Sequence, residues 1–291
     1  MKIGIIFNRI TWEIKQLISE MEKKHVNYKL LSNQKIYFKL SKEKDLDDNF
    51  DVILERSLSY LRGLYSCAIL ESKGYKVINT FECLNFSGNK LLTTLKLVEH
   101  NIPTPETCIA FKKESALKAI EDIIKYPAVL KPIIGSWGRL VARLDDYISA
   151  TGNLEAREEL GNIIQKIYYI QKYIPASKES NIKLPTDLRI FVVGDKCVAA
   201  MGRFHTDKDF RSNIAIGGTA EPIEITPELK KLSIKASKAV KGEIVGVDIM
   251  NDQEKLGVIE VNGTPQFKGV STATNINIAS EIIDYLLEEY R

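Results

Sequence analysis

Cysteine, histidine and long apolar runs are scarce in this sequence of 291 residues. The four cysteines are scattered without a CxxC pair, and the three histidines are too far apart to suggest a catalytic triad or a zinc cluster. We therefore expect buried thiols and structural histidines. No apolar stretch approaches the roughly 20 residues that a membrane span requires, and the apolar start of the chain is too short for a secretion signal. These absences predict a cytoplasmic protein without a membrane partner.

The net charge of the chain is also small. Lys and Arg number 41 against 38 Asp and Glu, which gives a formal net charge of +3. This charge is slight for a nucleic-acid-binding protein, and no basic block is interleaved with aromatic residues, so we expect no nucleic-acid partner. A weakly basic surface still favours an acidic partner. With 44% hydrophobic residues, the chain is typical of a globular protein large enough for two or three lobes.

The first part of the chain alternates strand-like and helix-like segments. Apolar strands are expected at 2–7, 51–54 and 75–79, with a helix over 12–24. This alternation predicts a small α/β domain with a parallel sheet. No GxGxxG turn follows the first strand, which argues against a dinucleotide-binding oxidoreductase. Arg56, Ser57 and Ser59 follow the second strand, where parallel sheets present ligand-binding loops, so we predict that they bind substrate.

The remainder is less regular. A polar helix carrying Lys90 precedes a connector whose two prolines, Pro103 and Pro105, require an extended chain. Helices are expected at 114–125 and 278–289, and strands at 128–131, 167–174 and 188–193. The polar segment 175–186, interrupted twice by proline, is predicted to be a loop.

A hairpin near the C-terminus carries three oxygen-bearing side chains. Two β-rich runs flank a polar, glycine-ended turn, and pairing Asp248 with Glu260 centres that turn on Glu254. Residues two apart share a strand face, so Asp248, Glu260 and Asn262 are expected to converge. Hard oxygen ligands on a rigid sheet suit Mg²⁺ that also binds substrate phosphates. Two exposed acids beside a turn are the alternative.

Lys131 ends an apolar strand, and a loop with two glycines follows it and closes at Arg139. Glycines let backbone N–H groups approach phosphate oxygens, and a lysine on the adjacent strand adds a fixed positive charge. The pattern indicates a phosphate clamp without a Walker A sequence. A structural turn is the alternative.

Three further patterns are ambiguous. The strand over 170–174 leads into a proline, and its backbone groups suit contacts with a nucleobase. A core strand without a ligand is the alternative. Asp187 and Arg189 lie on one strand face and form either a functional pair or a surface ion pair. Arg203 and Arg211 lie before a glycine pair, 217–218, and suit an anion or carboxylate site, because Arg binds both bidentately. A solvated loop is the alternative there.

Taken in chain order, these patterns resemble the ATP-grasp superfamily over almost the full length. The residues that carry the resemblance are Asn89-Lys90, Leu130-Lys131-Pro132, Gly135-Ser136-Trp137-Gly138-Arg139, Gln171-Lys172-Tyr173-Ile174, Asp187-Leu188-Arg189, Arg211-Ser212-Asn213, Asp248 and Glu260-Val261-Asn262. The chain is most similar to the RimK-type branch, and within it to the LysX and ArgX types. Those ligases attach an amino acid to the C-terminal glutamate of an acidic, LysW-type amino-group carrier protein in lysine and arginine biosynthesis.

The resemblance implies an α/β protein with an ATP-grasp fold and a Rossmann-like pre-ATP-grasp lobe at the N-terminus. Its lobes are expected at 1–85, 86–170 and 171–291, with ATP between the antiparallel sheets of the last two. ATP-binding residues are implied to be Lys90, Lys131, Gly135, Ser136, Trp137, Gly138, Arg139, Leu140, Val141, Gln171, Lys172, Tyr173, Ile174, Asp187 and Asn213. Asp248, Glu260 and Asn262 match magnesium ligands, with two ions expected.

The resemblance also implies how the substrates bind. Arg203 and Arg211 would stabilise the anionic intermediate. Substrate-binding residues are expected to be Arg56, Ser57, Ser59, Arg189, Arg203, Ile214, Ala215, Ile216, Gly217, Gly218, Gln266, Phe267, Lys268, Gly269 and Val270. The reaction implied is attack of a carboxylate on the γ-phosphate to give an acyl phosphate, followed by an amine that displaces phosphate.

Substrate choice rests on the segment Phe267-Lys268-Gly269-Val270. The glutamate-specific branch resembles Phe-Lys-Gly-Phe here, and the 2-aminoadipate-specific branch resembles Phe-Lys-Asn-Thr. Gly269 favours glutamate, whereas the smaller Val270 could widen the pocket and keeps 2-aminoadipate or dual use open. Lys172 and Gln266 also depart from the acidic residues usual at their positions.

Two other functions stay open. One is a RimK-like ligase with a different protein or small-peptide acceptor. Another is a non-catalytic nucleotide-binding regulatory module, which the intact magnesium ligands disfavour. A homo-oligomer, either dimer or tetramer, is compatible with the sequence.

Overall fold

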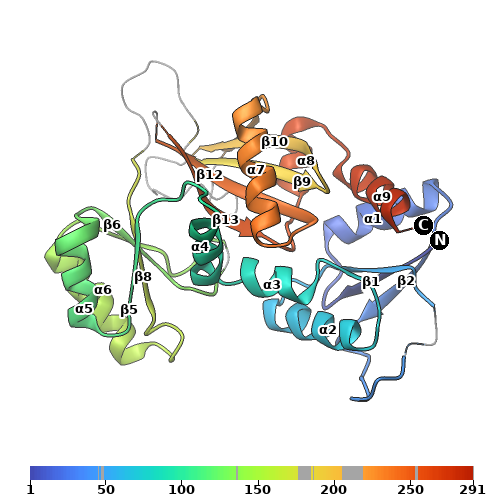
Figure 1. Ribbon diagram of the computed structural model, residues 1–291, viewed down its shortest axis with the longest axis horizontal. Helices are drawn as coiled ribbons and strands as arrows, with labels where there is room; N and C mark the ends of the chain where they lie inside the picture. The colour runs from blue at the N-terminus through green and yellow to red at the C-terminus, as the bar shows by residue number, and fades with distance from the viewer. Residues whose placement is uncertain are drawn as a thin grey trace.

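The computed structural model describes residues 1–44, 46, 49–135, 137–175, 185, 187–204, 219–252 and 255–290. Three sheets organise these residues into an N-terminal, a central and a C-terminal lobe (Figure 1). Within the described part of the chain, no helix is both long and apolar enough to cross a membrane.

The N-terminal lobe has a parallel four-stranded sheet in the order β2-β1-β3-β4, as the alternating pattern predicted. Its isoleucines in β1 are fully buried. The strand β2 was not predicted because only one of its six residues is buried, which leaves no apolar run to detect. The elements are β1 (Lys2–Phe7), α1 (Trp12–Lys23), β2 (Asn27–Ser32), β3 (Val52–Glu55), α2 (Tyr60–Ser72), β4 (Val77–Ile78) and α3 (Phe81–Ser87).

The central lobe has an antiparallel four-stranded sheet in the order β5-β8-β6-β7. The helix predicted over 114–125 is an α-helix only to Ala119 and continues as a π-helix. The strand β8 continues to Lys172, just past the expected end of this lobe. The elements, with the preceding helix α4 (Lys90–Glu99), are β5 (Thr107–Ala110), α5 (Lys113–Ala119), η1 (Ile120–Ile124), β6 (Ala128–Lys131), β7 (Ala142–Leu144), α6 (Tyr147–Leu160) and β8 (Tyr168–Lys172).

The C-terminal lobe is built on an antiparallel five-stranded sheet in the order β11-β10-β9-β12-β13. The predicted hairpin is confirmed, because Asp248 and Glu260 are direct partners in the β12–β13 register. A β-bulge follows Asp248. The elements are β9 (Asp187–Val193), β10 (Lys196–Phe204), β11 (Thr219–Pro222), α7 (Pro227–Ala239), β12 (Ile244–Asn251), β13 (Leu256–Asn262), α8 (Lys268–Thr274) and α9 (Ile278–Glu289).

The first and last lobes share a core. Ile5 and Leu17 belong to the same buried cluster as Phe267 and Leu286, and α1 packs against α9 (Figure 1). The buried Asn79 side chain strengthens this junction by donating to the carbonyls of Ile244 and Gly263, each at 2.6 Å. The two terminal lobes therefore form a joint platform, and the central lobe lies at the other side of the molecule.

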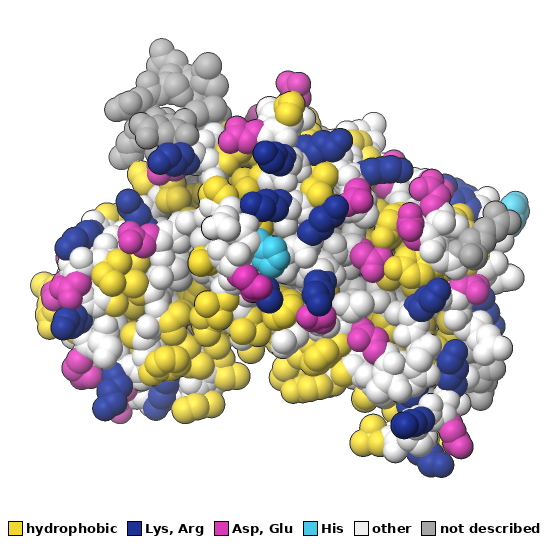
Figure 2. All heavy atoms as spheres, in the orientation of Figure 1, with side chains coloured by type: hydrophobic (Ala, Val, Ile, Leu, Met, Phe, Trp, Pro, Cys, Tyr) yellow, Lys and Arg dark blue, Asp and Glu magenta, His cyan; other side chains and the backbone are white. Residues whose placement is uncertain are grey.

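Figure 2 shows one face of the molecule, which is hollowed between the central and N-terminal lobes. Basic and acidic side chains are interspersed over this face.

The cysteines differ in burial. Cys67 and Cys83 are buried as expected, but Cys108 and Cys197 are only partly buried, so the prediction of four buried thiols was wrong for two.

Candidate active site

A cavity of ≈ 1460 Å³ lies where the three lobes meet. The ends of β6 and β8 line it from the central lobe, β9, β10, β12 and β13 from the C-terminal lobe, and the loops after β1 and β3 from the N-terminal lobe. Ligand sites commonly lie in such clefts between lobes. The cavity therefore brings together residues from every lobe of the chain.

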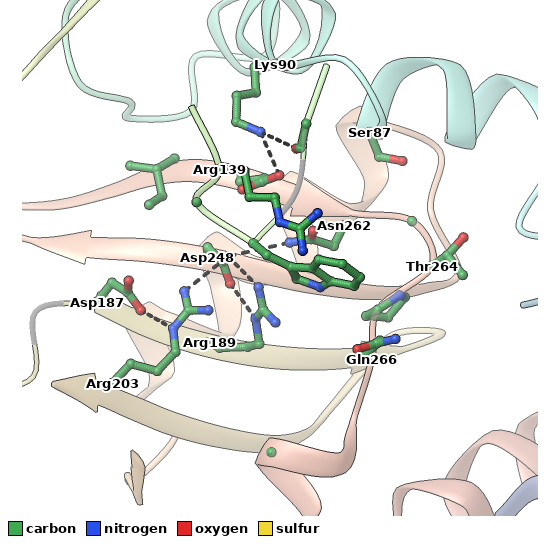
Figure 3. Close-up of a pocket in the computed structure, with 18 of the residues that line it drawn as sticks. Ser87, Lys90, Arg139, Asp187, Arg189, Arg203, Asp248, Asn262, Thr264 and Gln266 are labelled. Carbon is green, nitrogen blue, oxygen red and sulfur yellow. Dashed lines mark hydrogen bonds and ion pairs between the residues drawn. The ribbon is translucent and has the colours of Figure 1, made fainter. Parts of the chain in front are cut away.

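A buried ion-pair network forms the floor of this cavity (Figure 3). Arg189 binds Asp248 bidentately, at 2.7 Å from Nε to Oδ1 and 2.6 Å from Nη2 to Oδ2. Arg203 lies between Asp248, at 3.1 Å, and Asp187, which accepts a hydrogen bond from its Nε. Both Arg203 and Asp248 are about 95% buried. The interpretation of Asp187 and Arg189 as a surface ion pair was wrong, because each binds a residue on a neighbouring strand.

The network holds its members in their charged forms. Burial alone would raise the pKa of Asp248, but the two guanidinium groups lower it to about 2. Burial would likewise lower the pKa of Arg203, and the two aspartates reverse this and raise it. A buried charge is tolerated only when it is paired in this way.

The predicted magnesium ligands lie together on the hairpin. Glu260 accepts a hydrogen bond at 3.1 Å from Lys90, and the Asn262 amide lies 3.5 Å from Asp248 Oδ2 (Figure 3). No group of three His, Cys, Asp or Glu that could hold a metal occurs among the described residues. Two carboxylates and one amide are nevertheless hard oxygen donors of the kind that Mg²⁺ prefers. This donor set fits the ion.

Two lysines face the same region from different lobes. Asn89 caps α4 by accepting from the backbone N–H groups of Leu91 and Leu92, which fixes Lys90 at the first position of the helix. Lys131 at the end of β6 donates at 2.6 Å to Gln171 Oε1. Burial, followed by the proximity of Lys90, lowers the pKa of Lys131 to about 8. The Gln171 side chain is 2% exposed and is used to hold Lys131.

The glycine loop after β6 covers this region. Trp137, Gly138 and Leu140 adopt positive φ angles of 61°, 67° and 59°. The Arg139 guanidinium lies 5.1 Å from the centre of the Trp137 ring, within range of a cation–π interaction (Figure 3). Gly135, Trp137, Gly138, Arg139 and Val141 line the cavity, whereas Leu140 does not.

The expected hinge and substrate residues divide between cavity and core. Those that line the cavity are Lys172, Tyr173, Ile174, Ser57, Gln266, Lys268 and Gly269. Arg56 and Ser59 do not, and Arg56 is instead buried and donates at 2.7 Å to the carbonyl of Pro265. Phe267 and Val270 are fully buried in the core. The expectation that Val270 widens the pocket was therefore wrong, because its side chain does not reach it.

Several predicted site residues lie outside the described residues. They are Ser136, Arg211, Asn213, Ile214, Ala215, Ile216, Gly217 and Gly218.

The sequence patterns missed one part of the cavity wall. Arg9, Trp12 and Glu13 line it from the loop after β1 and the first turn of α1. Their position after the first strand of a parallel sheet is the same signal that pointed to residues 56–59, and it applies equally to both loops.

The cavity lies between two antiparallel sheets and contains lysines and hard oxygen donors, a combination that suits a nucleotide with its phosphates and a metal ion. Comparison with known proteins agrees. Residues 87–286 match the RimK-like ATP-grasp domain, and residues 3–85 match the LysX preATP-grasp domain. The chain belongs to the RimK-like ATP-grasp family and is an ATP-dependent ligase.

Curated relatives of similar length support this placement. The chain is 34% identical over 291 residues to the glutamate–LysW ligase ArgX of Sulfurisphaera tokodaii, covering 100% of this chain and 99% of the relative. It is 33% identical over 285 residues to the α-aminoadipate–LysW ligase LysX of the same organism, covering 97% of each. A RimK-domain ATP-grasp protein of Sphaerobacter thermophilus has the same fold, with a TM-score of 0.78, 23% identity and 98% and 99% of the two chains covered.

Proposed function

We propose that the protein joins the α-amino group of glutamate to the side-chain carboxylate of a C-terminal glutamate on an acidic, LysW-like carrier protein, as a step of arginine biosynthesis. The ArgX and LysX relatives support a LysW-like carrier, and the ArgX relative supports glutamate as the amino acid. The observation that carries the proposal is the continuity of the cavity, because the hinge residue Tyr173 and the substrate-end residue Gln266 line the same space. A nucleotide and a second substrate can therefore meet inside it.

The nucleotide end is built from backbone and cations. Residues 172–174 at the end of β8 would hold adenine through main-chain groups, and Lys90, Lys131 and Arg139 would bind the phosphates. Asn213 and Ser136 are further proposed contacts. The proposed lobe limits, 1–85, 86–170 and 171–291, assign these contacts to the second and third lobes.

Asp248, Glu260 and Asn262 would hold Mg²⁺, and we propose two ions. When bound, Mg²⁺ would neutralise part of the phosphate charge and orient the γ-phosphate. Lys90, Lys131, Arg189 and Arg203 outnumber the carboxylates of Asp187, Asp248 and Glu260, so this cluster has a positive excess. The ions are therefore expected to bind together with the nucleotide, whose phosphates reverse the local charge.

The chemistry follows from where the charges lie. The side-chain carboxylate of the carrier's C-terminal glutamate attacks the γ-phosphorus, ADP leaves, and an acyl phosphate forms. The α-amine then attacks the acyl carbon, loses a proton and displaces phosphate. Arg203 is held by two aspartates and can stabilise the anionic tetrahedral intermediate without reorienting. No side-chain nucleophile is needed.

Glutamate is the proposed amino acid because Gly269, the glutamate-type residue, lines the cavity. The argument for 2-aminoadipate from Val270 loses its basis, since that side chain lies in the core. Use of 2-aminoadipate is a second candidate supported by the LysX relative.

Steady-state ADP release tests the proposal. Release should require Mg²⁺, the amino acid and a carrier that ends in glutamate, and a carrier lacking that last residue is the matched control. Equal ADP release with the truncated carrier would contradict the proposed acceptor. Faster turnover with 2-aminoadipate than with glutamate would reverse the proposed substrate preference.

A further inference from the structure

The end of the cavity next to the N-terminal lobe contains a carboxylate that the ATP chemistry does not use. Four acidic side chains line the cavity, namely Glu13, Asp187, Asp248 and Glu260. The last three are in ion pairs with Lys90, Arg189 or Arg203. Glu13 forms no ion pair with any described residue, although it is only 3% exposed.

Local structure explains how Glu13 reaches this position. It lies in the first turn of α1, where the helix dipole stabilises a negative charge. The preceding residue Trp12 packs edge-on against Phe267 with 5.9 Å between ring centres. Glu13 Oε1 accepts a hydrogen bond at 3.2 Å from the backbone N–H of Lys268. The start of α1 is thereby fixed against the loop that follows β13.

Two cations that also line the cavity are connected to Glu13 through the chain or through its hydrogen bond. Arg9 precedes α1, and Lys268 is the residue whose backbone Glu13 binds. Like Glu13, neither forms an ion pair with a described residue. The loop 263–267 joins Lys268 directly to Asn262, so this end adjoins the proposed phosphate end. One negative and two positive side chains therefore line the cavity without an ion-pair partner among the described residues, although Glu13 keeps its hydrogen bond from Lys268 and lies near the charge of the buried Arg56.

This charge pattern is the complement of an acidic amino acid. Free glutamate carries one ammonium group and two carboxylates. We propose that Glu13, Arg9 and Lys268 form the amino-acid subsite, in which Glu13 binds the α-ammonium and the two cations bind the carboxylates. The inference rests on the proposed function and adds the residues that select the amino acid.

A purely structural role for Glu13 is the competing explanation, because its hydrogen bond caps the start of α8. Glu13→Gln separates the two, since glutamine keeps an oxygen acceptor for the Lys268 N–H and removes only the charge. Glu22→Gln is the matched control. Glu22 lies on the same helix and outside the cavity, and its side chain accepts from the Tyr28 hydroxyl at 2.9 Å.

Calorimetry with glutamate and with glutarate, in the presence of ADP and Mg²⁺, tests the proposal without requiring turnover. Glutarate has both carboxylates and lacks the ammonium group. Glu13→Gln should weaken glutamate binding about tenfold to a hundredfold, as expected for loss of a charged hydrogen bond, and change glutarate binding less than about threefold. Glu22→Gln should change neither. Glutamate binding by Glu13→Gln that equals the wild-type affinity would overturn the inference.

A second variant keeps the test decisive if Glu13→Gln does not fold. Arg9→Gln alters an exposed side chain and should weaken glutamate and glutarate by similar factors, because both carry the carboxylates. Unchanged binding of both would refute the subsite. If glutamate binds in the expected pattern but is never joined to a carrier, the proposed function fails while this inference stands. If ligation proceeds and Glu13→Gln has no effect on glutamate affinity, only the inference fails.

Discussion

The depressed pKa of Lys131 gives ATP binding a pH dependence. Burial and the neighbouring Lys90 lower this pKa from 10.5 to about 8 in the free protein. The nucleotide phosphates favour the charged ammonium and raise the pKa in the complex. At pH values between the Lys131 pKa of the free protein and that of the complex, ATP binding is therefore accompanied by the uptake of a proton. ATP affinity should be constant below pH 7, fall about twofold at pH 8 and fall about tenfold at pH 9.

Titration with a non-hydrolysable ATP analogue between pH 6.5 and 9.5, at fixed free Mg²⁺ and ionic strength, measures this effect. Lys131→Met should bind weakly and without the break near pH 8. Gln171→Glu places a carboxylate where Gln171 now accepts from Lys131 at 2.6 Å, so it should move the break upward by about one to three pH units. A flat profile in the wild type, or an unchanged break in Lys131→Met, would refute the reasoning.

Four further variants test other parts of the structure. Glu260→Gln should abolish turnover with an unchanged circular dichroism spectrum, and wild-type turnover would remove the metal assignment. Arg203→Ala removes the cation that Asp187 and Asp248 share, although Asp248 keeps Arg189, and should cost about 3–5 kcal/mol in urea unfolding, whereas a loss below about 1 kcal/mol would contradict the network. Asn79→Ala removes the hydrogen bonds between the terminal lobes and should cost about 2–4 kcal/mol by the same measurement; cooperative unfolding at the wild-type midpoint would count against it. Val270→Phe should overpack the core by about 1–3 kcal/mol and leave the KM for glutamate within about twofold; a changed KM at unchanged stability would place this residue back in the pocket.

Patterns with a strict period were predictable from the sequence. The β12–β13 register followed from a polar turn between two β-rich runs, and the structure pairs Asp248 with Glu260 as expected. The parallel N-terminal sheet followed from alternating strands and helices. The exposed strand β2 escaped detection because its residues do not form an apolar run.

Side-chain partners were less predictable, because they depend on the neighbours that the fold brings together. Asp187 and Arg189 are close in sequence, but β10 and β12 flank β9 and supply their actual partners. The family resemblance placed Val270 near the substrate, and packing against the terminal-lobe core turned its side chain away. Glu13 gave no signal of its own, since an acid in the first turn of a helix is usually explained by the helix dipole.

The most direct test of the central claim is the intact mass of a carrier protein ending in glutamate, after incubation with the enzyme, ATP, Mg²⁺ and glutamate. We expect a mass increase of one glutamate residue, and a fragment spectrum that places it on the side-chain carboxylate of the C-terminal glutamate. An unmodified carrier under conditions in which the enzyme binds both ATP and glutamate would contradict it.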